Sequence, residues 1–156
     1  MIKKRSVISV VGEMDHGKTT LLDSFLHTHY QKQEFGGTTQ VIRGNEFTLT
    51  DDTSSQPCTF LDTPGQSCFS YVIFFFFYDV QIRENGSILS DLTLYVISLY
   101  EGPSDEAHHI FQQLKENGVP VFALFTKTDL VSEERRNQVI SQISQLAKEY
   151  EVPLGR

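Results

Sequence analysis

The sequence contains no tryptophan, two cysteines and no apolar run long enough to cross a membrane. Cys58 and Cys68 lack a CxxC spacing and have no nearby histidine at ligand spacing, which excludes a disulfide framework and a zinc site. The longest apolar run, YVIFFFFY from Tyr71 to Tyr78, is far shorter than the roughly 20 residues that span a bilayer. We therefore predict no membrane partner and a reducing, cytoplasm-like compartment.

Basic residues are also scarce. Lysine and arginine together number 13 against 20 acidic residues, for a net charge of -7, which argues against the basic face of a nucleic-acid-binding protein, so we predict no direct DNA binding. The start MIKKRSVISVV is similar to that of a signal peptide, but its apolar run is too short and no small-residue cleavage site follows. A length of 156 residues with 39% hydrophobic content predicts one globular domain.

Strand-like and helix-like patterns alternate along the chain, which predicts an α/β fold with a mostly parallel sheet flanked by helices. Gly118 is placed to end one helix and Ser132 to cap the start of another. Ligands of such sheets bind beyond the carboxyl ends of the strands. The predicted strands are 6–11, 46–50, 58–62, 92–99 and 119–125, with 46–62 as an antiparallel hairpin, and the predicted helices are 19–30, 105–118 and 132–151.

The stretch GEMDHGKTT, which follows the first predicted strand, satisfies the phosphate-loop pattern G-x-x-x-x-G-K-[ST]. Backbone N–H groups of the loop and the start of the next helix can converge on phosphate oxygens. Lys18 would reach the β- and γ-phosphates, and the Thr19 hydroxyl would bind Mg²⁺. The alternative is a glycine-rich turn that merely connects strand to helix. The predicted nucleotide-binding residues here are Asp15, His16, Gly17, Lys18, Thr19 and Thr20.

A second motif, DTPG, closes the predicted hairpin strand at Asp62. Asp62 would hold Mg²⁺ through water, and the Gly65 N–H would contact the γ-phosphate at a point where a side chain would obstruct close approach. Alone, this tetrapeptide is a common turn. Its position after the phosphate loop favours a nucleotide sensor.

A third motif, TKTD, follows the predicted strand 119–125 and supplies Thr126, Lys127 and Asp129 as nucleotide-binding candidates. The Asp129 carboxylate can accept hydrogen bonds from N1–H and the 2-amino group of guanine, and adenine lacks both donors in that arrangement. Buried hydrogen bonds of this kind reject a wrong partner by about 10⁴. The alternative is an aspartate that caps a helix.

Together these motifs resemble the GTPase superfamily and, within it, the translational GTPases, whose phosphate loop reads G-H-V-D-H-G-K-T. The segment HTHYQKQEFGGTTQVI, residues 27–42, is similar to the first switch, HTHVQ-x-x-E-x-G-G-I-T-Q, of initiation factor 2 and initiation factor 5B. That match implies that Thr39 is the switch threonine that senses the γ-phosphate through Mg²⁺, with Thr38 standing where the family has Ile. It also implies that Asp15 helps to hold a monovalent cation near the phosphates.

Two positions depart from the family pattern. Gln66 stands where the family's D-T-P-G-H-E has a histidine that orients the attacking water. Glutamine does this in Ras-like GTPases, so we predict Gln66, with Lys18 and Thr39, as the catalytic set. Thr126 stands where the family has Asn, and the lost amide is one that bridges the base and the phosphate loop. We therefore expect weaker nucleotide affinity with an intact preference for guanine.

Residues 72–81 interrupt the family's second-switch pattern, which matches QSCFSY and IRENGSILSD when they are skipped. Four consecutive phenylalanines would load every side of a helix with aromatic bulk, which does not suit an exposed switch. Two explanations stay open. The segment is either a translated in-frame intron, since its codons can begin with GT, end in AG and be pyrimidine-rich between, or a true insertion that packs as a short buried strand.

The resemblance implies a GTP-binding and GTP-hydrolysing domain, with GTP or GDP and Mg²⁺ bound and slow turnover without the ribosome. On this interpretation the domain belongs to an initiation factor that joins ribosomal subunits and places initiator tRNA, in cytoplasmic or organellar translation. The family continues with a strand, an S-A-[KL] loop and a helix, so we interpret residues 1–156 as a C-terminally incomplete G domain. The alternatives are a Ras-like regulatory switch and a guanine-nucleotide-binding module that does not hydrolyse.

Overall fold

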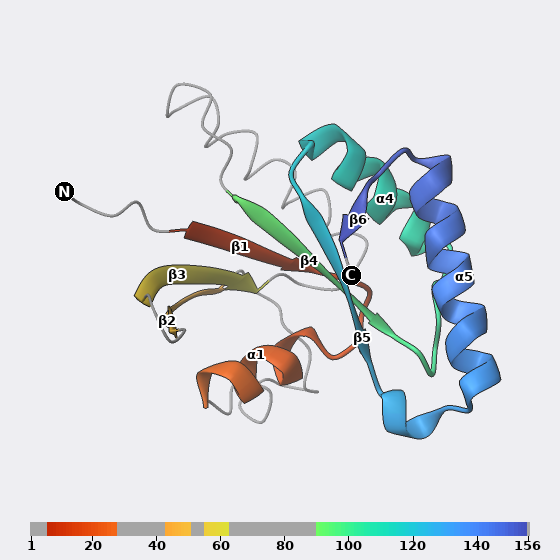
Figure 1. Ribbon diagram of the computed structural model, residues 1–156, viewed down its shortest axis with the longest axis horizontal. Helices are drawn as coiled ribbons and strands as arrows, with labels where there is room; N and C mark the ends of the chain where they lie inside the picture. Colours follow the sequence, from red (N-terminus) through yellow and green to blue (C-terminus); the bar gives the residue numbers. More distant parts are fainter. Residues whose placement is uncertain (1–5, 28–42, 51–54, 63–89, 156) are drawn as a thin grey trace.

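The structure is a computed structural model that describes residues 6–27, 43–50, 55–62 and 90–155. Six strands form one sheet in the order β2-β3-β1-β4-β5-β6 (Figure 1). All neighbouring strands run parallel except β2 and β3, which form an antiparallel hairpin. The strands are β1 Ser6–Val11, β2 Arg43–Thr50, β3 Ser55–Asp62, β4 Leu92–Ser98, β5 Val121–Thr126 and β6 Leu154–Gly155.

Three α-helices accompany the sheet in the described residues, with α1 on one side of it and α4 and α5 on the other (Figure 1). The helix α4 ends at Gly118, whose φ of 63° lets its N–H bond the Leu114 carbonyl. The Ser132 side chain caps α5 by accepting a hydrogen bond from the Arg135 N–H. The helices are α1 Lys18–Leu26, α4 Glu106–Asn117 and α5 Glu133–Glu149, and a 3₁₀ turn, η2, covers Thr128–Leu130.

Side chains on the two faces of the sheet build two hydrophobic cores. On the α4 and α5 side, Tyr95 and Ile97 of β4 pack with Phe111 of α4, and the Tyr95 and Phe111 rings meet edge to face at 5.3 Å. On the α1 side, Val96 of β4 packs with Leu22 of α1. Because β4 lies between parallel neighbours and is buried on both faces, its sequence reads as a nearly continuous apolar run.

The described elements confirm the predicted fold class, the hairpin and both helix boundaries at Gly118 and Ser132. One element differs from expectation: Leu154–Gly155 forms a two-residue strand, β6, parallel to β5, where the sequence pattern predicted none. The predicted insertion at 72–81 lies outside the described residues. Within the described part of the chain, no helix has the length and apolar character needed to cross a membrane.

The α4-side core leads to a prediction about stability. The Phe111 side chain is fully buried, so Phe111→Ala should lower the free energy of unfolding by about 3–5 kcal/mol, measured by chemical denaturation. Gln112→Ala, which alters the exposed neighbour on the same helix, is the matched control and should change that energy by no more than about 0.5 kcal/mol. Equal stabilities of the two variants would contradict the packing described above.

Candidate nucleotide site

The phosphate-loop sequence connects the carboxyl end of β1 to the start of α1, as predicted. Gly12 has φ 156°, and a Cβ atom there would lie 2.3 Å from the Val96 carbonyl oxygen of β4, so only glycine fits. Gly17, with φ 91°, immediately precedes the first helical residue, Lys18. The start of an α-helix directs backbone N–H groups and the positive end of the helix dipole toward a bound anion, so the start of α1 and the loop amides suit an anion.

Lys18 is buried and folds back over the loop. Its Nζ donates to the Gly12 carbonyl oxygen at 2.9 Å and to the Glu13 carbonyl oxygen at 2.7 Å. Both acceptors belong to the loop itself, so the ammonium group is held where an anion bound by the loop would lie. Thr19 and Thr20 follow in the first turn of α1, with Thr19 half-buried and Thr20 exposed.

The inner side of the loop holds a carboxylate that sequence reasoning missed. Glu13 is only 6% exposed, and its Oε1 accepts a hydrogen bond of 3.0 Å from the Ser104 N–H just before α4. Its Oε2 lies 4.0 Å from Nε2 of His16. Burial lowers the pKa of His16 below its ordinary value, although Glu13 opposes this shift, so the imidazole is neutral at pH 7. Asp15, in contrast, is exposed, with φ 61°.

The TKTD segment lies beside the phosphate loop, at the carboxyl end of β5. The Thr126 hydroxyl donates to the His16 carbonyl oxygen at 2.7 Å and approaches the Ile97 carbonyl oxygen at 3.3 Å. The replacement of Asn by Thr predicts the loss of an amide that bridges the base and the phosphate loop. The Thr126 hydroxyl nevertheless contacts the loop directly, and the expected weaker nucleotide affinity stays a prediction.

The two remaining candidates of this segment follow Thr126 directly. Lys127 has a left-handed backbone, φ 54°, and its Nζ pairs with Glu101 Oε1 at 2.7 Å. Asp129 lies in η2 and is exposed, so its carboxylate is open to a ligand from solvent. The sequence patterns did not mark Glu101, since no motif spacing joins it to the TKTD segment.

The second predicted motif is described only at its first residue. Asp62 ends β3 and is paired in register with Val10, one residue before the end of β1, so its backbone lies next to the phosphate loop. The other predicted residues of the switches, Thr39, Gly65 and Gln66, lie outside the described residues. The structure thus brings together the phosphate loop, the end of β3 and the TKTD segment at one edge of the sheet.

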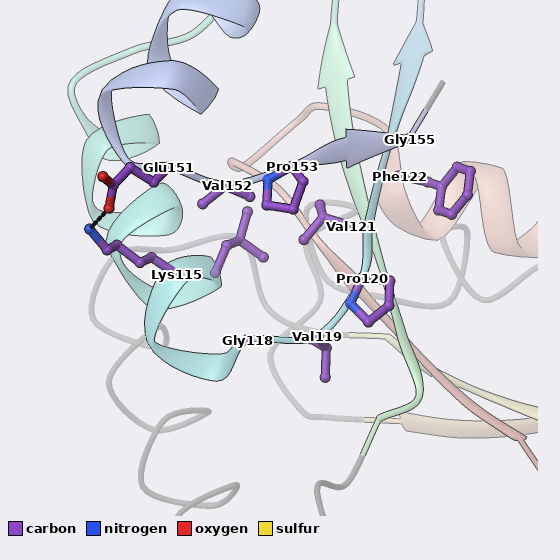
Figure 2. Close-up of a pocket in the computed structure, with 11 residues that line it drawn as sticks. Lys115, Gly118, Val119, Pro120, Val121, Phe122, Glu151, Val152, Pro153 and Gly155 are labelled. Atoms are coloured by element: carbon purple, nitrogen blue, oxygen red, sulfur yellow. Dashed lines mark hydrogen bonds and ion pairs between the residues drawn. The ribbon is translucent and has the colours of Figure 1, made fainter.

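A cavity of about 340 Å³ occupies a different place, at the amino end of β5 (Figure 2). Its lining includes Val121 and Pro153, and a surface ion pair between Lys115 and Glu151 stands at its rim. The phosphate loop lies at the carboxyl ends of the strands, so this cavity is separate from the candidate nucleotide site.

Comparison with known families settles which protein family has this site. Residues 3–154 match the family described as the Elongation factor Tu GTP binding domain. The chain belongs to this family. It is therefore the GTP-binding (G) domain of a translational GTPase, as the motifs predicted.

Curated relatives of this G domain are named translation initiation factor IF-2. The protein from Lactobacillus helveticus is 33% identical over 128 residues, which is 82% of this chain and 13% of that protein. The protein from Lactobacillus acidophilus is 34% identical over the same length, and that from Synechocystis sp. is 28% identical over 152 residues. The chain thus spans about one seventh of the length of the relatives it matches.

Solved structures with the same fold are also translation factors. A bacterial selenocysteine-specific elongation factor EF-Sec superposes with a TM-score of 0.73 at 20% identity, covering 97% of this chain and 25% of that one. The elongation factor SelB from Methanococcus maripaludis, in complex with the GTP analogue GppNHp, gives 0.69 at 21% identity, covering 95% and 27%. At these identities the likeness establishes the fold alone.

The Thr126 hydrogen bond generates a prediction. Thr126→Val keeps the shape of the side chain but removes the donor to the His16 carbonyl, so it should lower the free energy of unfolding by about 1–2 kcal/mol and weaken GDP binding. Denaturation and isothermal titration measure the two effects. Thr126→Ser, which keeps the hydroxyl, should stay closer to the unchanged protein in GDP affinity. A valine variant that binds GDP as tightly as the serine variant would show that the hydroxyl does not support the loop.

Proposed function

We propose that this G domain binds GTP and GDP with Mg²⁺ and hydrolyses GTP as part of a translation initiation factor. The observation that carries the proposal is the direct hydrogen bond between Thr126 and the His16 carbonyl. It joins the segment suited to read a guanine base to the loop suited to hold its phosphates. One nucleotide can therefore bridge both segments.

The phosphates would be held by the loop amides and Lys18. The ammonium group already lies over the loop, bonded to the Gly12 and Glu13 carbonyl oxygens. A phosphate oxygen can take a charge-assisted hydrogen bond from the same group, which is stronger than a neutral one. The buried, neutral His16 contributes no positive charge, so Lys18 carries the electrostatic attraction inside the loop.

The residue types proposed for this site suit a magnesium ion. Thr19 lies in the first turn of α1, and the backbone of Asp62 ends the strand that pairs with β1, so a residue with a hydroxyl and one with a carboxylate belong to neighbouring ends of the fold. Such hard oxygen ligands, few in number and completed by substrate phosphates, are those that Mg²⁺ prefers. Bound Mg²⁺ would neutralise charge on the β- and γ-phosphates. Thr39 is proposed as a further ligand and Asp15 as the residue that holds a monovalent cation.

Hydrolysis is proposed as in-line attack of water on the γ-phosphate. Gln66 would orient the water, while Lys18 and the loop N–H groups stabilise the charge that develops. Among the arginines whose side chains the structure describes, Arg135 and Arg136 of α5 donate to the Glu101 and Thr128 carbonyl oxygens, so neither is placed as an arginine finger. Turnover by the isolated domain should therefore be slow. The ribosome would then supply the missing activation.

The wider role follows the relatives named IF-2. We propose that the full-length protein acts in the cytoplasm or an organelle to promote the joining of ribosomal subunits and the placement of initiator tRNA. The similarity to IF-2 proteins, at 33% identity, favours this role over that of a Ras-like switch.

Lys18 gives the most direct test of phosphate binding. Lys18→Ala should weaken GDP binding in the presence of Mg²⁺ by about 100-fold or more, because it removes a charged donor from a buried loop. Isothermal titration measures the affinity, and circular dichroism checks that the variant is folded. Lys115→Ala, which removes a lysine of α4 that lines the cavity at the amino end of β5, is the control and should bind as the unchanged protein does. Unaltered affinity in a folded Lys18→Ala variant would overturn the assignment.

Asp129 tests the choice of base. Asp129→Asn replaces one carboxylate acceptor by an amide donor, which no longer matches the 2-amino group of guanine but matches the 2-oxo group of xanthine. The variant should lose affinity for GDP and gain affinity for XDP, whereas the unchanged protein should prefer GDP to both ADP and XDP. Asp91→Asn, at the amino end of β4, is the control and should keep that preference. An unchanged protein that binds ADP as tightly as GDP would contradict the role of Asp129.

A further inference from the structure

Lys127 of the TKTD segment has its side chain held by an ion pair with a part of the chain outside the recognised motifs. Its Nζ lies 2.7 Å from Glu101 Oε1, in the segment between β4 and α4, and the two side chains are 29% and 38% exposed. Thr126 on one side of Lys127 contacts the phosphate loop, and Asp129 on the other is the proposed reader of the base. Lys127 therefore lies in sequence between the residue that contacts the phosphate loop and the residue proposed to bind the base.

Glu101 is itself fixed in place. Its Oε2 bonds to the hydroxyl of Ser98, a fully buried residue at the end of β4. The Ser98 hydroxyl oxygen in turn accepts the N–H groups of Tyr100 and Glu101, at 3.2 and 3.3 Å. Both carboxylate oxygens of Glu101 thus have a named partner, and a rigid strand end sets the direction of the side chain.

The backbone around Glu101 is also restrained from two sides. Arg135 of α5 donates to the Tyr100 and Glu101 carbonyl oxygens at 3.2 and 2.9 Å. The Leu99 N–H donates to the Thr126 carbonyl oxygen at 3.0 Å, which ties this segment to the start of the TKTD motif. Burial alone would raise the pKa of Glu101, but the hydrogen bonds from Lys127 and Ser98 lower it overall, so the carboxylate is charged at neutral pH.

We propose that Glu101 is a positioning residue of the nucleotide site, which holds the Lys127 ammonium group on the β4 side so that the lysine's aliphatic stem is ordered before a guanine nucleotide binds. The inference rests on the proposed function. A free lysine side chain loses rotamer entropy when it is ordered. Ordering it in advance removes part of that cost from binding.

This role predicts how the loss of Glu101 should affect the affinities for GDP and for GTP. Lys127 belongs to the segment that faces the base, whereas Lys18 belongs to the loop that would hold the phosphates. Loss of Glu101 should therefore weaken GDP and GTP by the same factor. A residue that acted through the γ-phosphate would instead change the two affinities unequally.

A double-mutant cycle on the purified protein tests the proposal, with GDP and Mg²⁺ as the probe. Glu101→Ala should weaken GDP and GTP binding equally, by up to about fivefold, the range measured for partly exposed ion pairs. In a Lys127→Ala background the same substitution should have no further effect, because the lysine through which Glu101 acts is gone. If Glu101→Ala does not fold, Glu101→Gln replaces it, since its amide can still bond the Ser98 hydroxyl while the charge is lost.

Glu151→Ala is the matched control, because Glu151 forms an ion pair with Lys115 of the same 2.7 Å length at the other end of β5 (Figure 2). It should leave GDP affinity unchanged. Unaltered GDP affinity in the Glu101 variant, or the same loss with and without Lys127, would overturn the role of Glu101 while the proposed function stood. A folded, unchanged protein that binds neither GDP nor GTP would overturn both.

Discussion

The hydrogen bond from the Thr126 hydroxyl to the His16 carbonyl is the contact on which the site depends. It joins the carboxyl end of β5 to the phosphate loop that follows β1, two segments that are far apart in sequence. Gly12 makes this approach possible, because its missing side chain lets the phosphate loop lie against the Val96 carbonyl of β4. The central strands of the sheet therefore hold the phosphate loop in place. The loop packs against β4 at Val96, and Thr126 at the end of β5 forms a hydrogen bond with it.

Four charged side chains around this contact have named partners. Lys18 donates to carbonyl oxygens of its own loop, and Lys127 pairs with Glu101. The buried Glu13 accepts a hydrogen bond from a backbone N–H of the segment before α4. Lys18 and Lys127 thus lie at the carboxyl ends of the strands, where the nucleotide is proposed to bind.

The sequence predicted most of the fold because local signals and the hydrophobic pattern agreed. The apolar run of β4, the glycine at 118 and the serine at 132 each act within a few residues, and the structure has the elements they predict. The two-residue β6 was missed because it is short and is defined by its pairing with β5, a distant contact that no local sequence pattern predicts. Glu13 and Glu101 were missed for the same reason, since the Ser104 N–H and the Lys127 ammonium group that they bind lie in distant segments of the chain.

Thr126 shows what a family pattern leaves open. The family has Asn at this position, so its replacement predicts the loss of an amide that bridges the base and the phosphate loop. The Thr126 hydroxyl nevertheless donates to the His16 carbonyl oxygen, because the carboxyl end of β5 lies close to the loop. The sequence carries no direct measure of that distance.

The most direct test of the central claim is a crystal structure of the protein with GDP and Mg²⁺. The diphosphate is expected to lie within residues 12–18, bonded by the loop N–H groups and Lys18, with the guanine base against Asp129. A nucleotide bound at any other place on the molecule, such as the cavity at the amino end of β5, would contradict this binding mode.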